Sequence, residues 1–238
     1  MAQKMNSRIT ARQAILVLAW LPVHLFVLPW LLIRLIPPGS AILTEQGLLN
    51  YTTTLHVLLY GIGALYMLVV LWRFFRDDFD PIWEHPFRTL LMVIGAYLLS
   101  IFGQTLVSLL LDAIEITAGN ENNEIVSEMA VSNIGPTAAM SVFLAPIVEE
   151  SIFRAGVFGL LRRKSRVLAY LGSILLFGLY HVFEAALDDP IQLVFILQYV
   201  PPALALAYVY EKNDSIWASI FLHMLTNGVA MYALVTLQ

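Results

Sequence analysis

Long apolar runs alternate with short polar segments along this chain, and the apolar runs have the length of membrane-spanning helices. A helix needs about 20 apolar residues to cross the hydrocarbon core of a bilayer. Nearly charge-free runs of about this length occupy residues 13–33, 46–72, 89–111, 134–161, 167–183, 191–210 and 215–237. The pattern therefore predicts an all-α, polytopic transmembrane helix bundle with about seven spans.

Two polar features modify this pattern. Residues 112–133 form an acidic segment between the third and fourth spans, where a short surface helix is expected. Pro201 and Pro202 lie inside the sixth span, where proline removes a backbone hydrogen bond, so a kinked or broken helix is expected there. The acidic segment divides the chain into residues 1–133, with the first three spans and an external loop, and residues 134–238, with the last four spans.

The distribution of Lys and Arg predicts the orientation in the membrane. Cytoplasmic loops carry an excess of these residues. Eleven of the thirteen precede the first span or lie in the loops after the second, fourth and sixth spans, whereas Arg34 lies on the other side and Arg154 lies within a span. We therefore expect a cytoplasmic N-terminus, and an odd number of spans would place the C-terminus outside.

Composition supports a multi-pass membrane protein and limits its chemistry. The 238 residues are 59% hydrophobic and 13% charged, with a mean hydropathy of +0.77, which is too apolar for an ordinary soluble domain. The net charge of −4 gives no indication of a nucleic-acid partner, and the expected surroundings are the lipid bilayer. Cysteine is absent, which excludes disulfides, thiolate ligands and a cysteine nucleophile. Carboxylates, imidazoles, amides and hydroxyls are left to carry any chemistry.

Glu149, Glu150 and Arg154 are charged residues inside the fourth predicted span. A charge near the bilayer centre costs about 2.5 to 3.5 kcal/mol, so such residues usually pair and face the bundle interior. Glu150 and Arg154 are four residues apart and share a helix face, which favours an ion pair. Glu149 lies about 100° further round the helix, free to face a cavity. We interpret Glu150 and Arg154 as structural and Glu149 as chemical; a charge cluster that serves helix packing alone is the alternative.

Two later spans each carry a histidine with a partner one turn away. Phe177 and His181 form F-x-x-x-H on the fifth span, and His223 and Asn227 form H-x-x-x-N on the seventh. At a rise of about 1.5 Å per residue, Glu149 and His181 lie about 20 Å from their cytoplasmic helix ends, and His223 and Asn227 about 12 and 18 Å. These similar depths predict that the polar residues meet in one buried site.

Such a site is suited to hydrolysis in two ways. In the first, Glu149 and His181 activate a water molecule for attack on an amide carbonyl, while His223 and Asn227 donate hydrogen bonds to the developing oxyanion. In the second, Glu149, His181 and His223 bind Zn²⁺ with an open position for water. The H-E-x-x-H helix of the familiar zinc proteases is absent from the sequence.

Three motifs give the chain a resemblance to a known family. The segments E-E-S-I-F-R, F-G-L-Y-H and H-M-L-T-N match, in order and spacing, the E-E-x-x-x-R, F-x-x-x-H and H-x-x-x-N motifs of the CPBP family. This family includes the CAAX prenyl endopeptidases of the Rce1 type and the bacterial Abi proteins, some of which are linked to bacteriocin immunity. The resemblance covers residues 134–227, which predicts that the catalytic cavity lies within the last four helices.

The resemblance implies an intramembrane, glutamate-dependent endopeptidase in a bacterial or archaeal cell membrane. Its substrate would be a peptide or protein in or near the membrane, CAAX-like or of another kind. In this assignment Glu149 is the base, assisted by His181, and the oxyanion hole is built from His223 and Asn227. The supporting residues would be Glu150 and Arg154, which hold the helix, and Phe177, which packs beside the site.

The resemblance leaves alternatives to this assignment. The zinc scheme is the alternative chemistry, and a non-catalytic immunity or regulatory protein that retains the motif is the alternative function. An ion- or proton-coupled transporter is disfavoured because the chain lacks the paired broken helices and inverted repeats of such proteins.

Several other polar residues are assigned ordinary roles. His24 and His56 lie in the first two spans without a motif partner, so packing or interhelical hydrogen bonding is expected of both. His85 belongs to a charged loop. Tyr180 adjoins His181; packing is its expected role, and a hydrogen bond to substrate is the alternative. Glu184 is expected to mark the outer end of the fifth span, and the alternative is a contact with the site from the helix face of His181.

Overall fold

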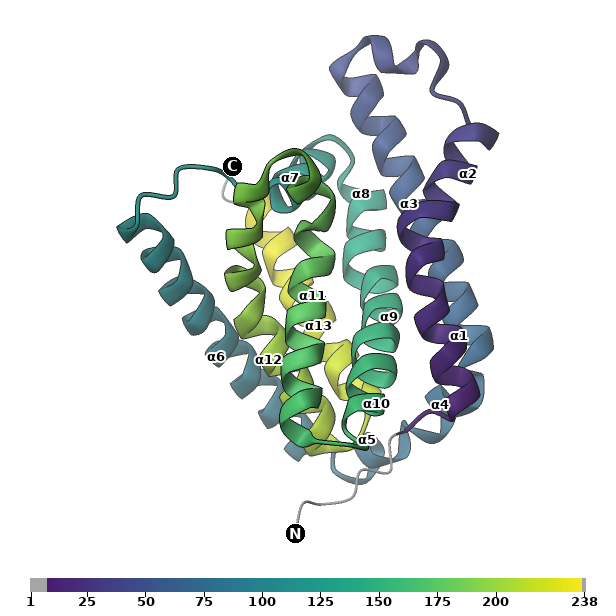
Figure 1. Ribbon diagram of the computed structural model, residues 1–238, viewed down its shortest axis with the longest axis vertical. Helices are drawn as coiled ribbons and strands as arrows, with labels where there is room; N and C mark the ends of the chain where they lie inside the picture. Colours follow the sequence, from purple (N-terminus) through teal and green to yellow (C-terminus); the bar gives the residue numbers. More distant parts are fainter. Residues whose placement is uncertain (1–7, 237–238) are drawn as a thin grey trace.

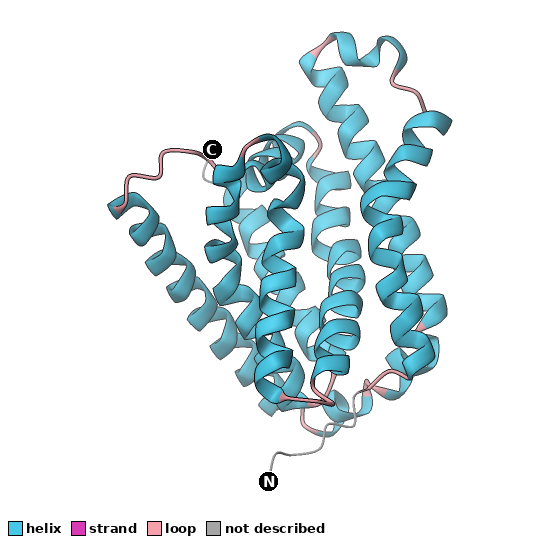
Figure 2. Ribbon diagram, viewed as in Figure 1, coloured by secondary structure: helices cyan, strands magenta, loops and turns pink. Residues whose placement is uncertain are grey.

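Helices account for all the regular secondary structure of the described residues, 8–236, in a computed structural model of the chain (Figure 2). Leu237 at the end of the seventh predicted span and Lys4 of the basic N-terminus lie outside this range. The first half consists of α1 (Ala11–Pro22), η1 (Val23–Val27), α2 (Leu28–Leu35), η2 (Gly39–Leu43), α3 (Glu45–Val70), α4 (Trp72–Asp77), α5 (Asp80–Glu84), α6 (Pro86–Ala113) and α7 (Glu121–Ser132). The second half consists of α8 (Ile134–Ala138), η3 (Ala139–Leu144), α9 (Ala145–Glu150), η4 (Ser151–Phe158), α10 (Gly159–Leu161), α11 (Arg166–Asp188), η5 (Pro190–Phe195), α12 (Ile196–Asn213) and α13 (Ile216–Thr236).

Six of the helices are long and apolar enough to cross a membrane, and they confirm six of the seven predicted spans. They are Ala11–Leu35, Glu45–Val70, Pro86–Ala113, Arg166–Asp188, Pro190–Asn213 and Ile216–Thr236, and each end lies within about five residues of its predicted position. The predicted fourth span, residues 134–161, is helical throughout but consists of α segments alternating with the π-helical segments η3 and η4. Because no single segment of it is long enough to cross a bilayer, the structure supports six candidate spans by length and composition.

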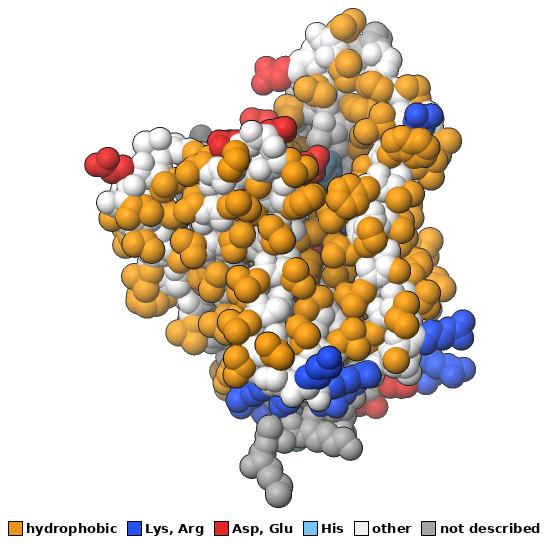
Figure 3. Space-filling view, viewed as in Figure 1, with side chains coloured by type: hydrophobic (Ala, Val, Ile, Leu, Met, Phe, Trp, Pro, Cys, Tyr) orange, Lys and Arg blue, Asp and Glu red, His pale blue; other side chains and the backbone are white. Residues whose placement is uncertain are grey.

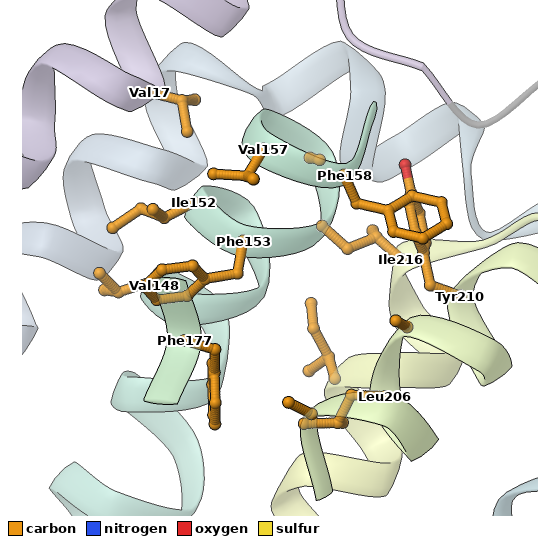
Figure 4. Close-up of a cluster of buried hydrophobic side chains, with 14 of the residues drawn as sticks. Val17, Val148, Ile152, Phe153, Val157, Phe158, Phe177, Leu206, Tyr210 and Ile216 are labelled. Atoms are coloured by element: carbon orange, nitrogen blue, oxygen red, sulfur yellow. The ribbon is translucent and has the colours of Figure 1, made fainter. Parts of the chain in front are cut away.

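The segmented helix from α8 to α10 lies at the centre of the bundle (Figure 1). It packs against α1 and α3 on one side and against α11 and α13 on the other, whereas α6 lies at the edge against α12 and α13. Every residue of η4 is buried. Its side chains Phe153 and Phe158 pack with Phe177, Tyr210 and Ile216 in the core shown in Figure 4. The predicted site therefore lies on the most enclosed helix of the molecule.

The outer surface fits a membrane environment. Apolar side chains cover most of the face seen in Figure 3, and Lys and Arg gather at the end where α10 is followed by α11. Acidic side chains gather at the opposite end. The positive end contains the loop of Arg162, Arg163 and Lys164, as the sequence pattern predicts.

Pro201 and Pro202 do not break the sixth span. α12 continues from Ile196 to Asn213 through both prolines, so the expected break is absent. Pro201 instead forms a close contact with α6: a Cβ atom added to Gly103 would lie 2.8 Å from Cβ of Pro201. The absence of a side chain at Gly103 therefore lets the two helices approach each other at the position where a proline ring faces α6.

We expect Gly103→Ala to destabilise the protein and Gly95→Ala on the same helix to leave it unchanged or more stable. The new methyl group at residue 103 would overlap Pro201, and overpacking costs about 1–3 kcal/mol. A Cβ at Gly95 would meet no atom within 4 Å, so there the higher helix propensity of Ala would contribute up to about 1 kcal/mol. Thermal unfolding of both variants in detergent checks this. Equal melting temperatures for the two variants would contradict the close contact.

Candidate active site

Glu149, Glu150 and Arg154 lie together where α9 changes into the π-helical segment η4. Their exposed fractions are 3%, 0% and 0%. π-helical turns inside α-helices are rare and frequently occur at functional sites. Two adjacent carboxylates and one guanidinium are thus enclosed in the protein interior, where each charge requires a partner.

Glu150 and Arg154 form a buried ion pair that joins four helices. Nη1 of Arg154 lies 3.1 Å from Oε1 of Glu150, and Nη2 donates a hydrogen bond of 3.2 Å to the carbonyl of Ala203 on α12. The guanidinium lies 4.6 Å from the ring centroid of Phe177 on α11. On α13, Nδ1 of His223 lies 2.9 Å from the same oxygen of Glu150. These contacts join Glu150, Arg154, Phe177 and His223 in one buried cluster, and the supporting role of the first three stays a prediction.

Glu149 faces a different set of side chains. Its Oε1 accepts a hydrogen bond of 3.2 Å from the hydroxyl of Tyr60 on α3. Its Oε2 is buried without a hydrogen-bond partner and lies 3.7 Å from Nε2 of both His181 and His223. A separation of this size is too long for a direct hydrogen bond. The structure therefore brings Glu149, His181 and His223 together, with both imidazoles facing one carboxylate oxygen.

The hydrogen-bond partner of His181 determines whether its Nε2 atom donates or accepts. Nδ1 of His181 lies 2.9 Å from the carbonyl of Phe177. Because a carbonyl can only accept, this Nδ1 carries a proton, and the neutral ring then has a free lone pair on Nε2. The ring of His181 also packs between Phe177 and Tyr199, each 4.5 Å away between centroids. His181 is thus oriented from both sides with Nε2 directed at Glu149.

Asn227 lies one turn beyond His223 on α13, but its amide is engaged elsewhere. Its Nδ2 donates a hydrogen bond of 2.8 Å to the backbone carbonyl of Ser141 in η3. An amide group has two N–H donors, so this contact leaves a second N–H for another acceptor. The structure therefore directs the amide of Asn227 at η3, and no hydrogen bond joins it to Glu149, His181 or His223.

The site also includes residues that the sequence motifs do not contain. Tyr60 was not a candidate, because nothing near it on the second span marks it. Its hydroxyl lies 2.9 Å from that of Tyr180, which in turn lies 3.0 Å from Nε2 of His24. His24 and Tyr180 were expected to have packing or hydrogen-bonding roles; the position of Tyr180 directly before His181 was the one available signal. His56 bonds to the carbonyl of Thr52 on its own helix.

The zinc scheme stays a prediction. Among residues 8–236, no three His, Cys, Asp or Glu side chains already lie in a metal-binding arrangement, although Oε2 of Glu149 lies 3.7 Å from Nε2 of both His181 and His223.

Comparisons with known proteins agree with the motifs. Residues 132–229 match the family model described as Type II CAAX prenyl endopeptidase Rce1-like. A protein of Bacillus subtilis (strain 168) named "Putative membrane peptidase YdiL" is 26% identical over 141 residues, which cover 58% of this chain and 54% of that protein. The chain thus spans about half the length of this curated relative. No solved structure matches the chain.

We expect Glu150→Gln to destabilise the protein far more than Glu149→Gln. Removing the charge of Glu150 leaves Arg154 buried without its ion-pair partner, which costs about 3–5 kcal/mol. At position 149 a glutamine oxygen can still accept from Tyr60, so the cost should stay below about 1.5 kcal/mol, the size of one ordinary hydrogen bond. Denaturant unfolding of both variants in detergent measures the difference. Equal losses would indicate that both glutamates serve helix packing.

Proposed function

We propose that this chain, whose residues 132–229 match the family model described as Type II CAAX prenyl endopeptidase Rce1-like, is an intramembrane endopeptidase that uses Glu149 as its general base. The observation that carries this proposal is the Oε2 atom of Glu149, buried without a hydrogen bond and 3.7 Å from two imidazole nitrogens. A carboxylate oxygen held in this way is ready to accept a proton from a water molecule.

The first step of the proposed reaction is attack by water. A water bound between Oε2 of Glu149 and Nε2 of His181 would donate a hydrogen bond to each. Its oxygen forms a bond to the carbonyl carbon of the substrate, one proton passes to Glu149, and the π electrons of the C=O bond move to the carbonyl oxygen. When the C–N bond breaks, Glu149 returns the proton to the leaving amine.

His223 would stabilise the oxyanion in this scheme as a cation. Its Nδ1 must donate to Glu150, because an ionised carboxylate can only accept, so donation from Nε2 requires a second proton on the ring. The ring lies between two carboxylates, with Nδ1 2.9 Å from Oε1 of Glu150 and Nε2 3.7 Å from Oε2 of Glu149. With His223 protonated, the charges of Glu149, Glu150, Arg154 and His223 sum to zero. The second N–H of Asn227 would be the other oxyanion donor.

The proposed topology has seven spans, a cytoplasmic N-terminus and a catalytic cavity within the last four helices. In this arrangement residues 134–161 cross the membrane as a segmented helix. Two observations support it: α1 begins and α13 ends at opposite ends of the bundle (Figure 1), and the positive end contains the start of α1 and the loop after α10 (Figure 3). An odd number of crossings fits the first observation, and the positive-inside rule fits the second.

Cysteine labelling tests this topology without background, because the chain has no cysteine of its own. We expect Glu121→Cys, at the start of α7, to react with a membrane-impermeant maleimide in intact cells. Lys164→Cys, in the basic loop after α10, should react after the membrane is permeabilised. Both side chains are exposed. Labelling of both residues from the same side would show that residues 134–161 do not cross the membrane.

Peptide cleavage by the purified protein in lipid tests the proposed activity. We expect the wild type to cleave members of a panel of quenched fluorogenic peptides, with and without a prenyl group. Glu149→Gln should lower the rate by about 10²–10⁴-fold, the usual contribution of a general base, while the melting temperature changes little. The comparison of prenylated with unprenylated peptides identifies the substrate class.

Two further outcomes would change the assignment. Cleavage that is lost on chelation, together with near-stoichiometric zinc that disappears in His181→Ala, would favour the zinc scheme. No cleavage of any peptide by the folded wild type would favour a non-catalytic immunity or regulatory role.

A further inference from the structure

A hydrogen-bonded chain of three side chains, two of which lie outside the matched residues 132–229, leads to Glu149. It runs from Nε2 of His24 to the hydroxyl of Tyr180 at 3.0 Å, from there to the hydroxyl of Tyr60 at 2.9 Å, and from Tyr60 to Oε1 of Glu149 at 3.2 Å. His24 lies in η1 of the first candidate span and Tyr60 in α3 of the second. Tyr180 lies in α11. Three elements distant in sequence are therefore joined in one chain, which ends at the oxygen of Glu149 that does not face the histidines.

The chemistry of the groups fixes the direction of this chain. An ionised Glu149 can only accept, so the single hydroxyl proton of Tyr60 points at Glu149. Tyr60 must then accept from Tyr180, and Tyr180 must accept from a protonated Nε2 of His24. This assigns His24 the neutral tautomer with its proton on Nε2 and none on Nδ1. Every donor in the chain is thereby directed at the carboxylate.

The surroundings of His24 point to a role other than packing. The residue is 2% exposed, and its Nδ1 is buried without a hydrogen-bond partner. An unsatisfied buried acceptor costs stability, so an apolar side chain would fill the position at lower cost. What the imidazole supplies there is the hydrogen bond from Nε2 to Tyr180. The π-helical turn η1, directly after Pro22, places His24 at this point.

We infer that Tyr60, held by Tyr180 and His24, is a positioning residue for Glu149 and that the first two helices thereby complete the site. By occupying Oε1, Tyr60 fixes the rotation of the carboxylate and leaves Oε2 facing His181 and His223. The inference rests on the proposed function of Glu149 as a base. It predicts effects on the rate of the chemical step, because Tyr60 acts through Glu149 and not on the substrate.

Steady-state kinetics of hydroxyl-deletion variants test the role. We expect Tyr60→Phe to lower kcat about 10- to 100-fold, the effect of losing one hydrogen bond to a charged group, with KM changed less than about twofold. Tyr180→Phe should lower kcat by a smaller factor. Because the two tyrosines act in series, the double variant should be no slower than Tyr60→Phe alone.

Tyr66→Phe is the matched control for Tyr60→Phe. Tyr66 lies on the same helix as Tyr60, and its hydroxyl donates a hydrogen bond of 3.1 Å to the carbonyl of Leu16 in the first span, away from Glu149. This variant should keep the wild-type kcat. Three results would each overturn the positioning role of Tyr60. They are equal kcat values for Tyr60→Phe and Tyr66→Phe, a rise in KM without a fall in kcat for Tyr60→Phe, and additive losses of kcat in the double variant.

The tautomer of His24 provides a test that does not depend on cleavage. The His24 signal in ¹⁵N NMR spectra of histidine-labelled protein is identified by its loss in His24→Gln. In the wild type and in Tyr66→Phe this signal should show a protonated Nε2 and an unprotonated Nδ1. Tyr180→Phe should change the His24 signal, because Nε2 of His24 then loses its hydrogen-bond acceptor. A proton on Nδ1 in the wild type would overturn the chain. If the wild type cleaves no peptide, the proposed function fails, while this measurement still decides whether the chain is directed at Glu149.

Discussion

The ion pair between Glu150 and Arg154 is the interaction on which the rest of the structure depends. Both side chains are fully buried, so the cost of removing them from water has to be offset by contacts inside the protein. Arg154 reaches Ala203 of α12 and Phe177 of α11, and Glu150 accepts from His223 of α13. The need to satisfy one charge pair thus fixes how three helices pack around α9 and η4.

Glu149, the neighbour of Glu150 in the sequence, contacts a different set of side chains. The two carboxylates are adjacent in sequence but point to different helices: Glu150 towards α13 and Arg154, Glu149 towards Tyr60 on α3. His223 connects the two sides, with Nδ1 at Glu150 and Nε2 near Glu149. The supporting pair therefore also orients one of the imidazoles that face the proposed base.

Local spacing made much of this arrangement predictable, and long-range contacts made the rest unpredictable. The four-residue separation of Glu150 and Arg154 predicted their ion pair. The similar expected depths of Glu149, His181 and His223 predicted that these three side chains lie close together. Tyr60 could not be found, since its contact with Glu149 spans 89 residues and depends on how α3 is rotated against α9. The hydrogen bond of the Asn227 amide to Ser141 could not be predicted either, because it depends on the course of η3. Nothing in the composition of residues 134–161 indicates where the α segments change to π segments.

The boundary of the site differs from the boundary of the motifs. The matched residues, 132–229, contain Glu149 and both facing histidines, yet one oxygen of Glu149 is held by Tyr60, and Tyr60 is linked through Tyr180 to His24. A division at residue 133 describes where the motifs lie, while the hydrogen bonds of the site cross it. In a membrane interior, where water does not supply missing partners, a buried carboxylate must take its donors from whichever helix lies beside it. Helices without any motif can therefore determine which oxygen of a motif residue is left to react.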